Sequence, residues 1–164
     1  MKYALCLGAL ALLGGCASFE PAAPADYTGP TVNVADQIQR RSDQLLHVFE
    51  IRRVDGRRLL SSSIATLNAN QGRGFSINPI AMTNELPLHA SRLQLMATTQ
   101  WAAPILALTH PTCQTEGEVS FQPQADRHYR VAGRIAPDEC SVWVEEIESG
   151  QPVTERVTGK GTGR

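Results

Sequence analysis

The chain has 164 residues, of which 42% are hydrophobic, 5% aromatic and 19% charged. This length suits one globular domain and excludes a second domain of full size. Fifteen basic and sixteen acidic side chains give a formal net charge of -1, so no global field draws the protein to nucleic acid. Ten prolines and thirteen glycines favour short elements joined by turns, which predicts a mainly β fold.

The chain starts with a short basic end and an apolar stretch. Met1 and Lys2 precede residues 3–15, which carry no charge. A membrane-spanning helix needs about 20 apolar residues, so the stretch is typical of an export signal, and residues 1–15 are the predicted signal peptide. It ends in Leu13-Gly14-Gly15-Cys16, which resembles the lipobox of bacterial lipoproteins. The resemblance implies cleavage before Cys16 and a lipid on its thiol. The alternative is an ordinary secretory signal beside a chance cysteine.

The residues after Cys16 predict where the protein is sorted and how it is held. In Gram-negative lipoproteins the next residue directs sorting, and Ala17 resembles members of the outer membrane. The resemblance therefore implies a lipid-anchored protein on the periplasmic side of that membrane. Residues 16–32 are rich in Ala and Pro and predict a tether that reaches up to about 40 Å from the bilayer. A domain over residues 33–157 and a flexible tail over 158–164 follow.

Two cysteines, Cys113 and Cys140, remain once the signal and Cys16 are set aside. A pair of cysteines in an exported domain predicts a disulfide, because that compartment is oxidising. The alternative is a zinc site that adds His110 and His128. Their spacing lacks the close ligand pairs at both ends that mark zinc modules, so we expect no metal and no cofactor.

The first part of the domain contains one predicted helix and one predicted hairpin. Apolar residues at 34, 38 and 45 recur at roughly helical spacing, which predicts a short helix over residues 33–46. Residues 47–60 alternate around Asp55-Gly56, a pair typical of a type I′ hairpin turn.

The same region mixes basic and acidic side chains. They are Arg40, Arg41, Arg52, Arg53, Arg57 and Arg58 among the bases, and Asp36, Asp43, Glu50 and Asp55 among the acids. We interpret the mixture as a solvated surface. The alternative is a single positive face formed by the arginine pairs.

Residues 61–108 predict loops around two strands. Residues 61–84 are interpreted as loop, short strand and loop, with Phe75, Ile77 and Ile80 buried. Residues 86–99 alternate with period two and predict a strand. Residues 101–108 contain Pro104, so we expect an edge strand or a buried loop there.

The last part of the domain is the most regular. Residues 118–122, 128–135 and 140–144 alternate and predict a three-stranded antiparallel meander, with a final edge strand over 153–157. Short strands at close spacing predict a two-layer antiparallel β-sandwich. Residues 47–157 resemble small bacterial envelope lipoproteins with immunoglobulin-like or transthyretin-like sandwiches, a resemblance that carries no functional residues.

The motifs of common enzymes are missing from the sequence. No G-x-S-x-G, H-E-x-x-H, Walker loop or S-x-x-K occurs, so we predict no catalytic residue. Glu145, Glu146 and Glu148 end a strand, where successive side chains point to opposite faces, and we expect a solvated edge there. The four histidines are scattered along the chain.

Two tryptophans are the candidate binding residues. Trp143 alternates with its core neighbours along the strand, so its side chain is expected to point outward. There it would anchor a partner, form a platform for a sugar or pack under a loop. Trp101 is expected to line a cleft. The first functional hypothesis is a non-enzymatic interaction or structural module for a periplasmic protein partner. The second is a module that binds a glycan or small ligand, and the third is a periplasmic enzyme.

Overall fold

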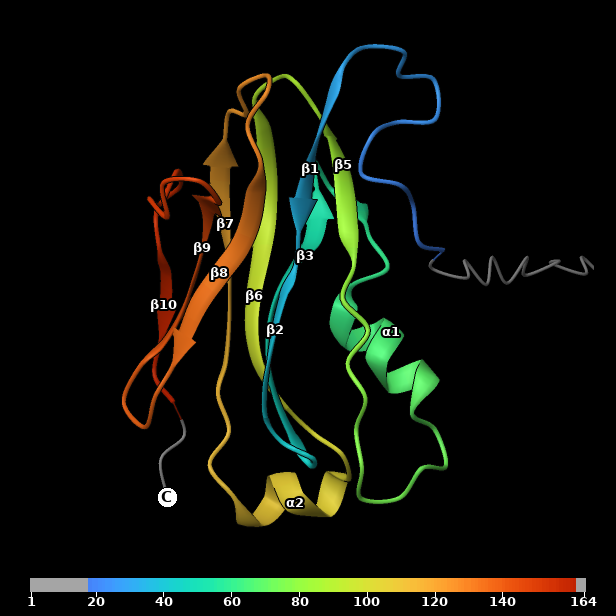
Figure 1. Ribbon diagram of the computed structural model, residues 1–164, viewed down its shortest axis with the longest axis vertical. Coiled ribbons are helices and arrows are strands. Elements are labelled where there is room, and N and C mark those ends of the chain that lie inside the picture. Colours follow the sequence, from blue (N-terminus) through green and yellow to red (C-terminus); the bar gives the residue numbers. More distant parts are fainter. Residues whose placement is uncertain (1–17, 162–164) are drawn as a thin grey trace, which may run out of the picture.

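The computed structural model describes residues 18–161, so the predicted signal peptide and Cys16 lie outside the described residues. Two β-sheets pack face to face, as Figure 1 shows, and the mainly β two-layer sandwich predicted from the sequence is confirmed. Most strand pairs are antiparallel, but β1 and β8 run parallel. No helix in the described range is long and apolar enough to cross a membrane.

Each sheet contains five strands. The first has the order β10 (Val157–Gly159), β9 (Cys140–Glu146), β8 (Tyr129–Ile135), β1 (Thr31–Ala35) and β5 (Thr83–Pro87). The second has the order β2 (Gln37–Ser42), β3 (Leu45–Val54), β6 (Ser91–Trp101) and β7 (Gln114–Phe121), with β4 (Arg57–Arg58) paired to β3. The chain crosses between the sheets several times, so most of its contacts are not local.

The predicted Asp55-Gly56 hairpin is confirmed. It joins β3 to β4, and both turn residues have positive φ, 48° at Asp55 and 84° at Gly56. A type I′ turn requires this conformation at both central positions. The strand predicted over residues 86–99 is also present, mostly as β6, with Leu93, Leu95 and Ala97 buried in the core.

The helix predicted over residues 33–46 is wrong, because β1 and β2 occupy this segment. Val32 and Val34 are both buried, which is the period of a strand rather than a helix. Asp36 lies at the corner where the chain leaves the first sheet and enters the second. Two short strands therefore replace the helix.

Two helices replace segments predicted as loops or strands. Helix α1 (Ser62–Ala69) lies within residues 61–84, and α2 (Pro104–Thr109) starts within residues 101–108 and ends one residue beyond them. Of the three apolar residues expected to be buried in the first segment, Ile77 is buried but Phe75 and Ile80 are exposed. Pro104 fits the start of α2, where its missing N–H costs nothing.

The predicted three-stranded meander is wrong in one respect. Strands β8 and β9 pair as expected, but β7 pairs with β6 in the opposite sheet. The disulfide between Cys113 and Cys140 is confirmed, and their Cα atoms lie 6.0 Å apart. Because Cys113 directly precedes β7 and Cys140 begins β9, the bond joins the two sheets. Closing a loop of 27 residues stabilises the fold by roughly 3 to 4 kcal/mol in the chain-entropy account.

Both ends of the predicted domain extend further than expected. Strand β10 includes Thr158 and Gly159, which fall in the predicted tail, and begins only at Val157. At the other end, residues 19–30, here called the N-terminal strap, lie against the sandwich. The backbone N–H of Glu20 donates to the carbonyl of Arg58 at 2.8 Å, and Ala22 is only 6% exposed.

The core between the sheets is packed closely around Phe49. A Cβ atom added to Gly133 of β8 would overlap the ring of Phe49 and the carbonyl of Ser141. Phe121 and Tyr129 meet edge to face across the core, with ring centroids 5.1 Å apart. Gly133 is therefore required by the space that the Phe49 ring occupies.

We expect Gly133→Ala to lower the free energy of unfolding by about 1–3 kcal/mol, because the added methyl group overpacks the core. Urea denaturation followed by circular dichroism measures the change. Ser120→Ala, at an exposed position of β7, is the matched control and should leave stability unchanged. Equal stability of the Gly133→Ala protein and the wild type would contradict the close packing.

Candidate functional site

The candidate site is a hollow between the two sheets, and unequal strand lengths create it. Strands β3 and β6 have 10 and 11 residues, whereas β8 and β9 have 7 each. The inner face of the second sheet therefore continues past the edge of the first. Side chains at alternate positions share a face, so the inner residues at this end have no opposing strand to pack against.

The hollow has a volume of about 470 Å³, which is in the range of small-molecule sites. Leu45 pairs with Trp101 and His47 with Thr99 in the β3–β6 ladder, and all four line it. The other lining residues come from the segment before β7, from the end of β8 and from the chain end: Pro111, Thr112, Cys113, Ile135, Ala136, Pro137 and Gly161. The disulfide thus contributes one wall.

The chemistry of the lining is mainly apolar. Among the described residues that line the hollow there is no carboxylate, lysine or arginine. Burial, with the charge of Arg41 as a smaller cause, lowers the pKa of His47 below its ordinary value of 6.5. His47 is therefore neutral at pH 7. A site of this kind favours an uncharged, apolar ligand over an anion or a cation.

Trp101 was expected to line a cleft, and it lines the hollow. Its ring packs against His110, with centroids 4.7 Å apart. Its indole Nε1 is buried without a hydrogen-bond partner among the described residues. A buried indole N–H normally has an acceptor. Among the described side chains that line the hollow, this is the one buried polar atom without a partner.

Trp143, the other candidate, lies on the outer face of the first sheet and is half-buried. The guanidinium of Arg156 lies 4.2 Å from the centre of its ring, and its Nε1 donates to Glu145 at 3.0 Å. The segment after β9 thus covers this ring. The structure does not bring Trp143 and Trp101 together in one site, because they lie on different sheets.

The residues of the alternative zinc site are not brought together. Cys113 and Cys140 are bonded to each other, and His128 Nδ1 lies 2.6 Å from Glu148, whose pKa this hydrogen bond lowers. Within residues 18–161 no cluster of His, Cys, Asp and Glu could hold a metal ion.

The solvated edge predicted for the three glutamates is wrong for Glu145, which is 7% exposed. Its carboxylate accepts hydrogen bonds from Arg130 Nε at 2.7 Å and from Trp143. The Glu145 carboxylate therefore makes a structural contact between β8 and β9.

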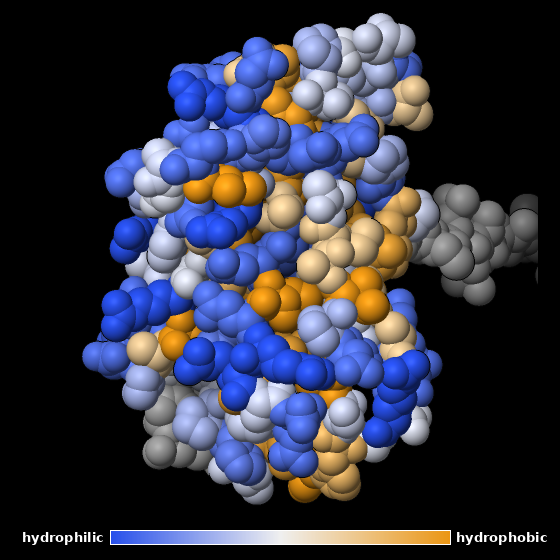
Figure 2. Space-filling view, in the orientation of Figure 1, coloured by the Kyte–Doolittle hydropathy of each residue, from blue (hydrophilic) through white to orange (hydrophobic). Residues whose placement is uncertain are grey.

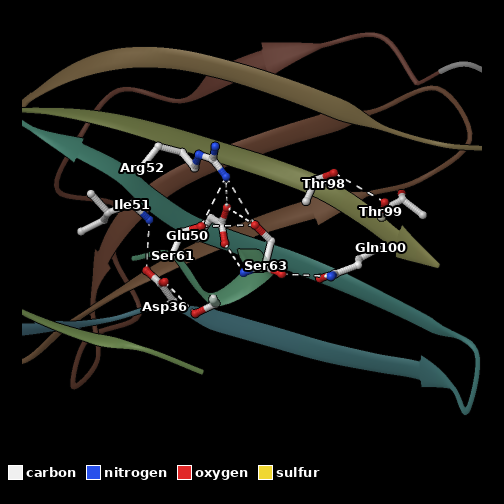
Figure 3. Close-up of polar contacts among 10 residues, drawn as sticks. Asp36, Glu50, Ile51, Arg52, Ser61, Ser63, Thr98, Thr99 and Gln100 are labelled. Atoms are coloured by element: carbon white, nitrogen blue, oxygen red, sulfur yellow. Dashed lines mark hydrogen bonds and ion pairs between the residues drawn. The ribbon is translucent and has the colours of Figure 1, made fainter. Parts of the chain in front are cut away.

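Two acidic residues expected on the surface are buried. Glu50 of β3 is fully buried and accepts hydrogen bonds from the backbone N–H of Ser63 at 2.6 Å and from the Ser63 hydroxyl at 2.7 Å (Figure 3). Arg52 Nη1 lies 3.2 Å from the same carboxylate. Ser63 lies in the first turn of α1, where a carboxylate is favourable. Glu50 thus caps α1 from another element, while Ser61 makes no side-chain cap.

Asp36 is the second buried acid, at 5% exposure. It accepts a hydrogen bond from the Ile51 N–H at 3.0 Å (Figure 3). It accepts a second from the Ser62 hydroxyl at 2.7 Å. Burial raises the pKa of Asp36 to about 7. The nearby charge of Glu50 also raises this pKa, whereas the hydrogen bonds from Ser62 and Ile51 lower it. Asp36 therefore joins the corner between β1 and β2 to β3 and to the start of α1. Neither burial was expected, because both acids were interpreted as part of the solvated mixed-charge surface of this region.

The remaining surface mixes charge with scattered apolar groups. Figure 2 shows a largely hydrophilic side on which apolar residues gather near β2, β5 and α1. Ion pairs link Arg57 to Asp55 at 3.5 Å and Arg92 to Glu118 at 3.3 Å. The arginines thus lie among acids, as the mixed-charge interpretation expects.

Comparison with protein families, with curated proteins and with solved structures finds no match to this chain.

We expect the pH dependence of stability to report the buried Asp36. Its pKa rises from 3.8 to about 7 on folding, so the native state binds this proton more tightly than the unfolded state does. The stability that the proton contributes is complete below pH 3.8 and is lost as the pH rises to about 7. Asp36→Asn removes this titration.

Urea unfolding of both proteins across this pH range tests the prediction. The stability of the wild type, relative to Asp36→Asn, should fall as the pH rises. Asp43→Asn is the matched control, because the Asp43 side chain is 85% exposed. The stability of the wild type relative to Asp43→Asn should not change across this pH range. Parallel pH profiles for wild type and Asp36→Asn would contradict the prediction.

Proposed function

We propose that this protein is a lipid-anchored protein of the cell envelope that acts by binding, not by catalysis. The lipid is carried by Cys16, as the resemblance of Leu13-Gly14-Gly15-Cys16 to a lipobox implies. Ala17, as the residue after that cysteine, favours the periplasmic side of the outer membrane. Its binding site is the hollow beside Trp101. The site takes a small uncharged apolar ligand or an apolar side chain of a periplasmic partner.

The observation that carries the proposal is the hollow itself. It has about 470 Å³ of space, and its walls come from both sheets and from the segment at Cys113. His47, the one ionisable side chain among the described lining residues, is neutral at pH 7 because burial lowers its pKa. Apolar burial therefore supplies the binding energy, at about 25 cal/mol per Å².

The hypothesis of a sugar platform at Trp143 receives less support. Sugar rings stack on an open aromatic face, and Arg156 lies over the Trp143 ring. An enzyme would need a nucleophile or a proton donor and acceptor at the hollow, and the lining offers His47 without a carboxylate beside it. We therefore place the function at the Trp101 hollow.

We expect straight-chain 1-alkanols to bind the hollow with an affinity that rises with chain length. Each added methylene should tighten the dissociation constant about fourfold until the space is filled. Isothermal titration calorimetry of the purified protein measures the series. Ala136→Phe, which places a ring in the hollow, should abolish binding.

Two variants make this test specific. Ala81→Phe adds the same ring at an exposed position and should leave binding unchanged. Trp101→Phe keeps an aromatic ring in the wall and should preserve the dependence on chain length. Affinity that does not depend on chain length, or that survives Ala136→Phe, would refute the hollow as the binding site.

We expect Cys16→Ser to block both lipidation and removal of residues 1–15. The intact mass of the product should then be that of the uncleaved chain without fatty acid. Cys6→Ser, within the predicted signal peptide, is the control and should be processed as the wild type is. Normal processing and normal membrane fractionation of Cys16→Ser would overturn the proposed anchor.

A further inference from the structure

The N-terminal strap is bound to the sandwich at its first residues. Beyond the backbone bond of Glu20 to Arg58, Arg57 Nη2 donates to the carbonyl of Ala22 at 2.7 Å. The Ala22 side chain belongs to the main hydrophobic core. The guanidinium of Arg58 lies 5.0 Å from the centre of the Phe19 ring. These contacts hold the start of the strap against β4.

The rest of the strap also follows the surface of the domain. The backbone N–H of Leu88 donates to the carbonyl of Pro30 at 3.1 Å, and the Tyr27 hydroxyl donates to the same carbonyl at 2.9 Å. The Tyr27 ring lies edge to face with His89. Figure 1 shows this segment, in dark blue, beside the upper ends of β1 and β5. The strap therefore does not act as a spacer.

Docking of the strap shortens the reach between the predicted lipid and the domain. Cys16 precedes Phe19 by three residues, and three extended residues span at most about 11 Å. An undocked tether over residues 17–30 would reach about 40 Å. The docked strap thus holds the Phe19–Arg58 contact no more than about 11 Å of chain from Cys16, so β4 stays close to the bilayer surface.

We propose that the β4 side of the domain lies directly against the phospholipid surface. This inference rests on the proposed lipidation of Cys16. The Phe19 side chain is 41% exposed and Arg58 lies over its ring, and aromatic and cationic side chains are favoured at the membrane–water interface. Arg53, the register partner of Arg58, adds a second cation on this side.

The same orientation directs the hollow away from the membrane. Leu45, which lines the hollow, begins β3, and the β4 hairpin follows its other end. Ten residues of strand span about 33 Å. The opening beside Trp101 therefore faces the periplasm, where a soluble ligand or partner reaches it.

Tryptophan reporters in the lipidated protein test this orientation. Arg53→Trp places a reporter beside the strap, and Ile105→Trp places the matched reporter on α2, at the opposite end of the sandwich. Each protein is reconstituted in phosphatidylethanolamine and phosphatidylglycerol vesicles with acyl chains brominated near the headgroup, which quench tryptophan on contact. Fluorescence is compared with that of the protein that has only its native tryptophans.

The inference expects quenching of the Arg53→Trp reporter and none of the Ile105→Trp reporter. A Gly-Ser insertion of about ten residues between Ser18 and Phe19 adds roughly 17 Å of flexible chain and should abolish the quenching at Arg53→Trp. Equal quenching of both reporters, or none at either, overturns the orientation. The intact mass of the vesicle-bound protein shows independently whether a lipid is attached. A protein without lipid refutes the proposed anchor, whereas a lipidated protein with equal quenching at both reporters refutes the orientation alone.

Discussion

The antiparallel ladder between β3 and β6 is the constraint on which the rest of the structure depends. It pairs Leu45 with Trp101 at one end and Val54 with Leu93 at the other, and it is longer than any pair in the opposite sheet. Its middle forms one wall of the core, where Phe49 packs over Gly133. Its excess length forms the hollow, so core and candidate site are two parts of one continuous face. Strand length thus sets one wall of the site, and the segments around Cys113 and Ala136 supply the others.

Two buried carboxylates join helix α1 and the β1–β2 corner to this ladder. Glu50 caps α1 from β3, and Asp36 joins the β1–β2 corner to Ser62 and Ile51. Helix α1 has no acidic residue in its first turn and no basic residue in its last. Its own sequence therefore provides little helix stability, and short helices in proteins depend on tertiary contacts. The buried acids supply those contacts.

These contacts explain which features were predictable. Alternation in β6 and the Asp55-Gly56 turn are local signals, and the prediction of a sandwich followed from them. The Cys113–Cys140 bond followed from composition and compartment. Alternation identifies the buried face of a strand but not the sheet that it joins, so β7 was assigned to the wrong sheet. The cap by Glu50 and the docking of Ala22 join residues distant in sequence, and the hollow depends on relative strand lengths, which no local pattern reveals.

The disulfide between the sheets determines when the wall of the hollow is secured. Cys113 is part of the wall of the hollow, and its bond to Cys140 requires an oxidant. A newly made chain in a reducing compartment has both thiols and an unsecured wall. For the proposed exported protein this would order maturation: translocation precedes oxidation, and the Cys113 wall is secured only once its bond to Cys140 has formed.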